Sequence, residues 1–371
     1  MKQRLKSERG ITLVALVVTI VVLLILAGIT IMYTMGENSI FKKAQDAKDK
    51  TAEAVKNEQE YMNSIDNMVN GYINGTGNGG GSTPTGPVVD NSSTGEHTET
   101  TVEYTWEQID KIAQAIANSS KVTNETTEVT ANIDGTNLKL GVGDIATVQY
   151  SGTSVRVRVL GFKHDDLVDQ TVYGGTHKKA SISFEFLDFM TGDTYKSMNS
   201  TNTNENGWAA TQMRKDLNGY TTSDATQSGV IGGLGANLSN KSYIKQVKKK
   251  YIATYNRASS VTTCNDYLWL LSCSEIWSKG RSDYSGAAYG LAIGKEGDQY
   301  KWYKDNEKGI DPSVANSNFV KKTPPSGSAY YWWLRSPDYY NSIDFCGVNS
   351  NGYSSNGSAS NTRGVTPGFS I

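Results

Sequence analysis

Hydrophobic and polar positions divide the chain into regions with different patterns. Residues 11–32 carry no charge, and threonine is their only polar side chain. A helix of this length spans roughly 33 Å, enough to cross a bilayer. Residues 41–69 place apolar side chains at helical spacing opposite a Lys-, Asp-, Glu- and Gln-rich face. Together, residues 11–70 predict a long apolar and then amphipathic helix.

Beyond residue 70 the pattern changes twice. Residues 71–101 are rich in Gly, Thr and Ser, which predicts a flexible linker. From residue 102 onward, helical and alternating patterns follow one another, which predicts an α+β head over 102–371. The expected helices are 104–117, 206–218 and 242–251, and the expected strands are 142–150, 155–160, 181–187 and 267–272.

Charge and composition exclude several classes of function. The 36 Lys and Arg residues nearly balance the 37 Asp and Glu residues, so the chain lacks the excess of positive charge that phosphate backbones attract. We therefore expect no nucleic-acid partner. Three His and three Cys are too few for a His-built metal centre or a disulfide scaffold. No phosphate-binding loop or nucleophile motif is found, so we expect no enzyme activity and no cofactor.

Two smaller groups of residues leave alternatives open. Cys264 and Cys273 either pair as a disulfide on adjacent strands or remain two buried thiols. The run His164-Asp165-Asp166, with Asp188 or Asp193, has the ligand types for a cation. We interpret these residues as exposed loop carboxylates and expect no metal.

A short basic leader, residues 1–10, precedes the apolar segment and ends in Gly10 followed by Ile11. Positive charges on this side keep it cytoplasmic and place the remainder of the chain outside. The junction resembles the signal of type IV prepilins. That resemblance implies cleavage by a prepilin peptidase between Gly10 and Ile11, with residues 11–32 in the cell membrane.

The same resemblance implies that residues 11–70 contact other pilin subunits in a surface pilus. Ala15 stands where the prepilin family usually carries Glu, which leaves open whether the chain polymerises. A plain signal anchor is the alternative for this segment. A secretory signal peptide fits less well, because the apolar run is longer than such peptides usually have.

The C-terminus has an unusual composition. Of residues 338–371, 7 are Ser, 5 Asn, 5 Gly and 3 Tyr, and none is Lys, Glu, Gln, Met or Trp. Tyr, Ser, Gly and Asn are enriched in antibody-like binding loops, where Tyr supplies rigid contact area and the others supply adaptable hydrogen bonds. The five missing residue types are those that an Asn AAC codon cannot reach when its first two bases are randomised.

With Trp332-Trp333-Leu334-Arg335-Ser336-Pro337 before this segment and Gly364-Val365-Thr366-Pro367-Gly368-Phe369 at its end, the sequence resembles the variable proteins of diversity-generating retroelements. There, a reverse transcriptase copies a template with errors at adenines into the 3′ end of the target gene. The resemblance implies a C-type-lectin-like head, related to the formylglycine-generating-enzyme fold, with a variable region over 338–363. Thr366 stands where the family often has Arg.

These observations predict a surface-displayed, pilin-like adhesion protein whose variable segment binds an unknown protein or glycan. The expected ligand-binding residues are Asp338, Tyr339, Tyr340, Asn341, Ser342, Ile343, Asp344, Gly347, Asn349, Ser350, Tyr353, Ser354, Ser355, Ser358 and Ser360. The alternative is a structural minor pilin or pseudopilin with a static lectin-like head. An enzyme of the formylglycine-generating type would need a catalytic Cys, and Cys264, Cys273 and Cys346 match no such motif.

Overall fold

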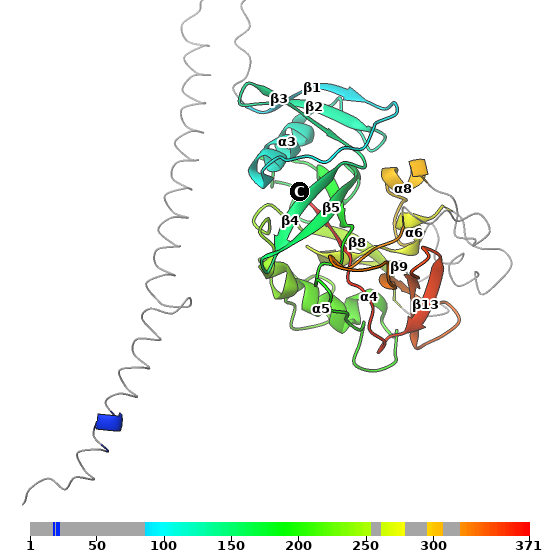
Figure 1. Ribbon diagram of the computed structural model, residues 1–371. Coiled ribbons are helices and arrows are strands. Elements are labelled where there is room, and N and C mark those ends of the chain that lie inside the picture. The colour runs from blue at the N-terminus through cyan, green and yellow to red at the C-terminus, as the bar shows by residue number, and fades with distance from the viewer. Residues whose placement is uncertain (1–17, 19, 23–85, 254–260, 279–294, 307–319) are drawn as a thin grey trace, which may run out of the picture. The chain divides into compact units, whose positions relative to one another are not determined.

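Strands dominate the part of the chain that the computed structural model describes, which is residues 18, 20–22, 86–253, 261–278, 295–306 and 320–371. The chain divides into two units, residues 1–85 and 86–371, and all elements below belong to the second. Of the helices with described bounds, α3 (Trp106–Asn118) is the longest, with 13 residues. The architecture is therefore mostly β (Figure 1).

This finding corrects the expected fold class. The expected fold class, α+β with a long N-terminal transmembrane helix and a C-type-lectin-like head, does not describe what the structure shows: the described residues form mainly antiparallel sheets with a few short helices. No helix in this part of the chain is long and apolar enough to cross a membrane. The predicted leader 1–10, with Gly10 and Ile11, and nearly all of the predicted helix 11–70 lie outside the described residues.

The N-terminal sheet has the order β1-β2-β3, formed by β1 (Val88–Ser93), β2 (Glu128–Ile133) and β3 (Thr136–Gly141). Helix α3 packs against β1 and β2 (Figure 1). It begins at a capping box in which the Thr105 hydroxyl accepts from the Gln108 amide, and the Gln108 side chain accepts from the Thr105 amide. Its apolar face, with Ile109, is buried.

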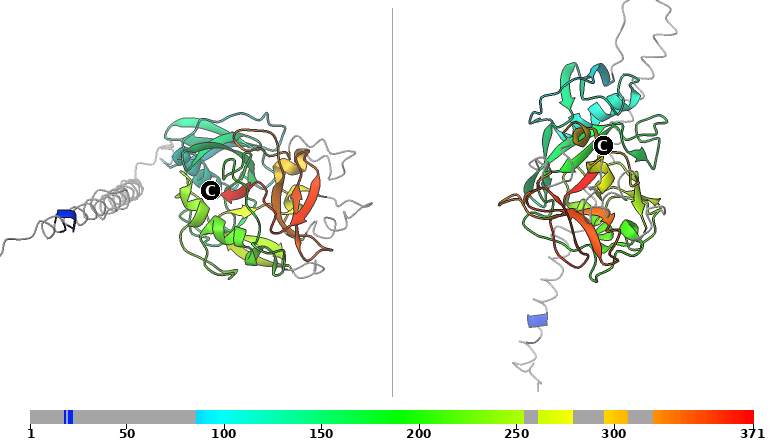
Figure 2. Two further views of the ribbon diagram at one scale, coloured as in Figure 1. Left: turned by 60° about the horizontal axis from the view of Figure 1, so that its bottom comes forward. Right: turned by 90° about the vertical axis from the view of Figure 1, so that its right-hand side faces the viewer.

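The central sheet has the order β10-β14-β7-β5-β4. Its strands are β4 (Ile145–Tyr150), β5 (Thr153–Phe162), β7 (Ile182–Phe186), β10 (Trp269–Leu270) and β14 (Pro367–Ser370). The last strand of the chain lies between β7 and β10, and Phe369 stacks on Phe184 with ring centroids 5.1 Å apart. The C-terminus is consequently inside the unit, as the three views show (Figures 1 and 2).

Two smaller antiparallel sheets complete the unit. One contains β6 (Asp166–Leu167), β8 (Val247–Ile252) and β9 (Val261–Asp266), in that order. The other contains β11 (Trp332–Pro337), β12 (Asp344–Val348) and β13 (Ser354–Ser358). The connecting helices are α4 (Gly207–Ala210), α5 (Gln212–Asn218), the 3₁₀ helix η1 (Gly233–Asn237), α6 (Cys273–Ile276) and α8 (Lys301–Asn306).

Three local expectations differ from the structure. Residues 242–251, predicted as a helix, contribute to β8. The helix predicted over 206–218 is divided at Thr211, whose hydroxyl caps α5 by accepting from the Arg214 amide. Residues 88–93 lie within the predicted linker 71–101, yet they form β1. The run Val88-Val89-Asp90-Asn91-Ser92-Ser93 is mostly polar, so its pairing with β2 could not be seen from its composition.

Candidate ligand-binding surface

The sheet β11-β12-β13 is anchored by buried aromatic side chains. Trp332 and Trp333 of β11 are fully buried, and so is Phe345 of β12. The indole nitrogen of Trp332 donates to the Val320 carbonyl at 3.0 Å, and that of Trp333 donates to the Lys196 carbonyl at 2.9 Å. Buried indoles with satisfied N–H groups fix both the position and the orientation of the first strand.

Strand β13 is the outer strand of this sheet and carries small polar side chains. It lies at the periphery of the unit (Figure 2). Two backbone acceptors of this strand are used within the chain: the Arg363 guanidinium donates to the Asn356 carbonyl, and the Asn361 amide donates to the Ser358 carbonyl at 2.8 Å. An edge protected in this way is a poor template for pairing with another strand. The side chains of this strand, rather than its edge, are therefore the groups that it presents to solvent.

The loop between β11 and β12 is held at both ends by carboxylates. Asp338 accepts from the Tyr340 amide at 2.8 Å and from the Asn356 side chain at 2.7 Å. Asp344 accepts from the Ser358 hydroxyl at 3.0 Å. The tip between these anchors projects outward, and Tyr340 is 61% exposed. The loop therefore combines fixed ends with an exposed tip.

The turn between β12 and β13 is organised by Asn349. Its side-chain carbonyl accepts from the backbone amides of Asn351 and Tyr353, and its backbone amide donates to the Tyr353 carbonyl at 2.9 Å. Gly352 has a φ of 83°, a left-handed conformation that favours glycine. This turn brings Tyr353 and the start of β13 back alongside β12.

The predicted ligand-binding residues fall into three groups by burial. Tyr340, Ser342, Ile343 and Ser360 are exposed. Tyr339, Asn341, Asn349, Ser350, Tyr353, Ser354, Ser355 and Ser358 are partly buried. Asp338, Asp344 and Gly347 are buried. The structure thus gathers most of the predicted set on the outer side of one sheet and its two loops.

Gly347 lies under the Arg363 guanidinium and is inaccessible to a ligand. A Cβ atom at this position would lie 2.5 Å from Nη1 of Arg363 and 2.7 Å from the Trp332 carbonyl oxygen. Arg363 in turn lies over the ring of Trp333, 4.4 Å from its centroid, and over Tyr331 at 5.1 Å. The sequence did not indicate a role for Arg363, because this residue was noted only as the last position of the predicted variable region. Nor did the sequence indicate a role for Asn356 or for the distant Asn204, whose positions depend on tertiary contacts.

Carboxylates elsewhere are paired in the interior. Asp165, expected in an exposed loop, is buried and 2.6 Å from the Lys249 ammonium. Burial by itself raises the pKa of Asp165, but Lys249 and His164 outweigh it and hold that pKa well below 3.8. Asp188 forms an ion pair with Arg156 at 2.8 Å. Among the described residues, no group of three or more His, Cys, Asp or Glu side chains could hold a metal ion.

The three cysteines are free and buried. Cys264 lies on β9, where its thiol donates to Asp266 at 3.2 Å, whereas Cys273 begins α6. The expected alternative of a Cys264–Cys273 disulfide is therefore absent from the structure. Burial, together with Asp266, raises the pKa of the Cys264 thiol, so this group stays protonated and unreactive at neutral pH.

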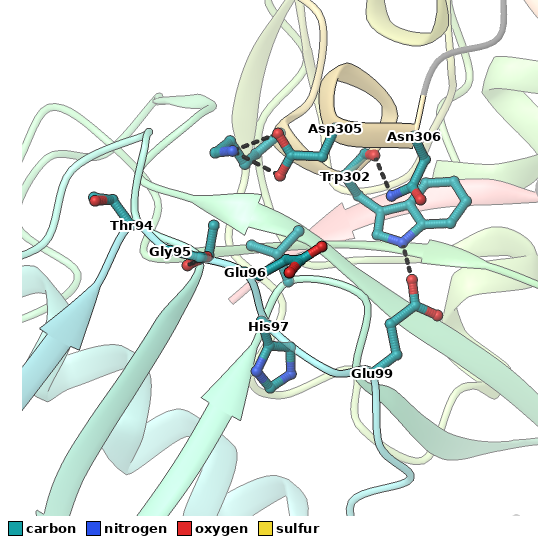
Figure 3. A pocket seen from close by; sticks show the side chains of 11 residues that line it. Thr94, Gly95, Glu96, His97, Glu99, Trp302, Asp305 and Asn306 are labelled. Carbon is teal, nitrogen blue, oxygen red and sulfur yellow. Dashed lines mark hydrogen bonds and ion pairs between the residues drawn. The ribbon is translucent and has the colours of Figure 1, made fainter.

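A cavity of about 330 Å³ lies between the segment that follows β1 and helix α8 (Figure 3). Its polar groups contact one another: Glu99 accepts from the indole nitrogen of Trp302 at 2.6 Å, and Lys301 pairs with Asp305 at 2.5 Å. The His97 ring contacts two carboxylates that do not line the cavity. We interpret this cavity as part of a polar interface between α8 and the segment after β1.

The fold and the surface together define a mostly β protein whose C-terminal sheet presents small polar and tyrosine side chains on a fixed frame. A family model matches residues 182–371, and the chain belongs to that family, described as Domain of unknown function (DUF6273). No curated protein and no solved structure matches the chain. The matched residues begin at β7 and include the whole β11-β12-β13 sheet.

Proposed function

We propose that this protein binds a ligand through the surface formed by the accessible side chains of residues 339–343 and 349–360, and that a diversity-generating retroelement varies that surface. The observation that carries the proposal is the separation of two roles within one segment. Side chains such as Tyr340, Ser342 and Ile343 are exposed. The strand residues between the loops, such as Phe345, are buried and keep the backbone in place.

The chemistry of the exposed side chains supports a binding role. Tyr339 and Tyr340 pack edge to face with centroids 5.0 Å apart, so Tyr340 presents its ring at a defined angle. Ser, Asn and Gly around them adapt their hydrogen bonds at low conformational cost. A protein or glycan surface is the class of ligand that such a mixture fits.

The proposal does not include catalysis. Several of the titratable groups buried in the described interior are engaged in ion pairs, as between Arg214 and Asp266 at 2.7 Å and between Arg158 and Glu185 at 2.6 Å. A nucleophile or general base needs a group that is free to react with substrate. Paired groups of this kind stabilise an interior, which fits a binding protein better than an enzyme.

The experiment that tests the proposal is to sequence the DNA that flanks the gene. We expect a reverse-transcriptase gene and a second, near-identical copy of the codons for residues 338–361 that differs mainly at adenines. A gene with neither of these nearby would overturn the retroelement part of the proposal and would favour the alternative of a static minor pilin or pseudopilin head.

Display at the cell surface is a separate part of the proposal, supported by the prepilin-like junction between Gly10 and Ile11. We expect removal of residues 1–10 in the protein purified from its own cells. Intact-mass measurement detects this loss directly, and Gly10→Val should block it because a branched side chain replaces the smallest residue at the scissile bond. A retained leader in the wild-type protein would contradict surface display by this route.

A further inference from the structure

We propose that Asn204 is a positioning residue that holds the backbone of the 338–344 loop in one conformation whatever side chains the loop carries. This inference rests on the proposed function, because it explains how a surface can vary without losing its shape. Asn204 lies far from the loop in sequence and outside the predicted variable region. It is fully buried beneath the loop.

The contacts of Asn204 are directed at carbonyl oxygens of the loop. Its side-chain Nδ2 donates to Asn341 O at 2.6 Å and to Asp344 O at 2.7 Å. A weaker third contact reaches Asp338 O at 3.4 Å, and the backbone amide of Asn204 donates to Ser342 O at 2.8 Å. An amide NH₂ has two hydrogens, so the two short bonds use its donor capacity fully.

Carbonyl acceptors do not depend on the side chain of the residue that carries them. A change at Asn341 or Ser342 would therefore leave its bond to Asn204 intact. Contacts made by the loop's own side chains behave differently, because the bond between the Asn341 side chain and Asp344 at 3.0 Å is lost when Asn341 is replaced. The bonds from Asn204 survive substitution at the tip, as do the backbone bonds from the Ala359 amide to the Ile343 carbonyl at 2.8 Å and from the Asp338 amide to the Asp344 carbonyl at 3.0 Å.

The segment that carries Asn204 is itself tightly fixed. Asn206 and Gly207 have φ values of 62° and 58°, both left-handed, and the Gly207 amide donates to the Asn204 carbonyl at 3.0 Å. A Cβ at Gly207 would lie 2.0 Å from the Ile252 carbonyl oxygen, so the turn is packed directly on β8. A rigid turn of this kind fixes Asn204 relative to the core, and Asn204 in turn fixes the loop.

The test compares two variants of the full chain with a matched control. Asn204→Asp keeps the shape of the side chain but replaces the donor by an acceptor, and Asn204→Ala removes both. Asn218→Ala is the control, because Asn218 is also buried and donates to carbonyl oxygens, at Arg214 and Leu268, but does not contact the loop. Hydrogen exchange of amides 339–343 is the first readout.

We expect exchange at 339–343 to become about tenfold faster in both Asn204 variants, as the loss of hydrogen bonds to the backbone predicts. Amides of β5 and β7 should keep their wild-type protection, and the control should leave 339–343 unchanged. Unchanged exchange in the Asn204 variants would overturn the proposal. Loss of protection throughout the unit in both variants would also overturn it, because Asn204 would then support the whole unit.

The second readout separates this inference from the proposed function. Residues 339–343 are randomised in the wild-type and Asn204→Ala backgrounds, and protease-resistant members are counted in each library. We expect most members to remain folded with Asn204 and at least tenfold fewer without it. Equal fractions in the two backgrounds would overturn the role of Asn204. A wild-type library that is mostly unfolded would instead contradict the proposed variable surface, and the exchange data would still decide the role of Asn204.

Discussion

Arg363 shows at the residue scale how the variable segment combines fixed and replaceable positions. Its guanidinium lies over Trp333 and covers Gly347 and Gly357 of neighbouring strands. At Gly357 the three atoms nearest to a Cβ all belong to the guanidinium, the end of a flexible side chain. At Gly347 it would also meet the Trp332 carbonyl, and a backbone atom in a sheet cannot turn away. Gly347 is therefore the more restricted of the two positions.

We predict that Gly347→Ala lowers the free energy of unfolding by about 1–3 kcal/mol, the usual cost of forcing an extra methyl group into a packed site. Urea denaturation followed by tryptophan fluorescence measures this change. Gly86→Ala is the control, since nothing lies within 4 Å of a Cβ there. Equal stability of the two variants would mean that the Trp332 carbonyl and Arg363 leave room for a methyl group at position 347.

Composition alone could not separate these roles. It marked residues 338–371 as unusual, and Tyr340, Ser342 and Ile343 of that segment are exposed in the structure. It also assigned Gly347 to the same surface, because glycine is frequent in binding loops. The restriction on Gly347 comes from the Trp332 carbonyl of the neighbouring strand and from the Arg363 side chain that folds back over it, and such contacts leave no trace in local sequence.

At the scale of elements, β8 explains why one prediction was wrong. Its burial alternates, with Val247, Lys249 and Tyr251 inward and Lys248 exposed. This alternation is typical of a strand. It cannot be seen in the sequence when every charged residue is assumed to be exposed, because Lys249 occupies an inward position. Lys249 is tolerated inside because it contacts Asp165 at 2.6 Å and Glu275 at 2.5 Å.

Burial alone would raise the pKa values of both carboxyls, but their cationic partners, Lys249 for Asp165 and chiefly Arg335 for Glu275, lower them below 3.8 and 4.5. A carboxyl whose pKa is lower in the folded state adds stability above its unfolded pKa and loses it as the pH falls through the folded value. These groups therefore stabilise the protein above about pH 4.5 and lose that contribution at lower pH.

We predict that Lys249→Met lowers the free energy of unfolding by ~3–5 kcal/mol at pH 7, because it leaves Asp165 buried without its cation. The deficit relative to wild type should shrink at pH 4, where Asp165 of the variant can bind a proton. Urea denaturation at the two pH values measures this, with exposed Lys248→Met as the neighbouring control. A deficit that does not change with pH would contradict the assigned ion pair.

At the scale of the whole molecule, the central sheet joins residues from both sides of the family boundary. The matched residues begin at β7, but β7 pairs with β5, which precedes them. Glu185 of β7 also forms buried ion pairs with Arg158 of β5 and with Lys322, each within 2.6 Å. Local patterns predicted α3 and several of these strands. They could not predict which strands pair, because pairing depends on residues far apart in the chain.

We predict that the fragment 86–371 folds cooperatively and that 182–371 does not, since the latter exposes the β5 side of β7 and leaves Glu185 without Arg158. The fragment 102–371, which begins at the head boundary expected from the sequence, lacks β1 and should melt at lower temperature than 86–371. Circular dichroism melting of the three fragments tests this. Equal melting of 86–371 and 102–371 would show that β1 is dispensable.

The most direct test of the central claim is to sequence the 3′ end of the gene from many cells of one lineage. The account predicts that differences concentrate at adenine-containing codons of surface positions such as Tyr340, Ser342 and Ile343, while Trp332 and Phe345 stay unchanged. Differences spread evenly over residues 86–371, or Lys and Glu appearing freely between 338 and 361, would contradict it.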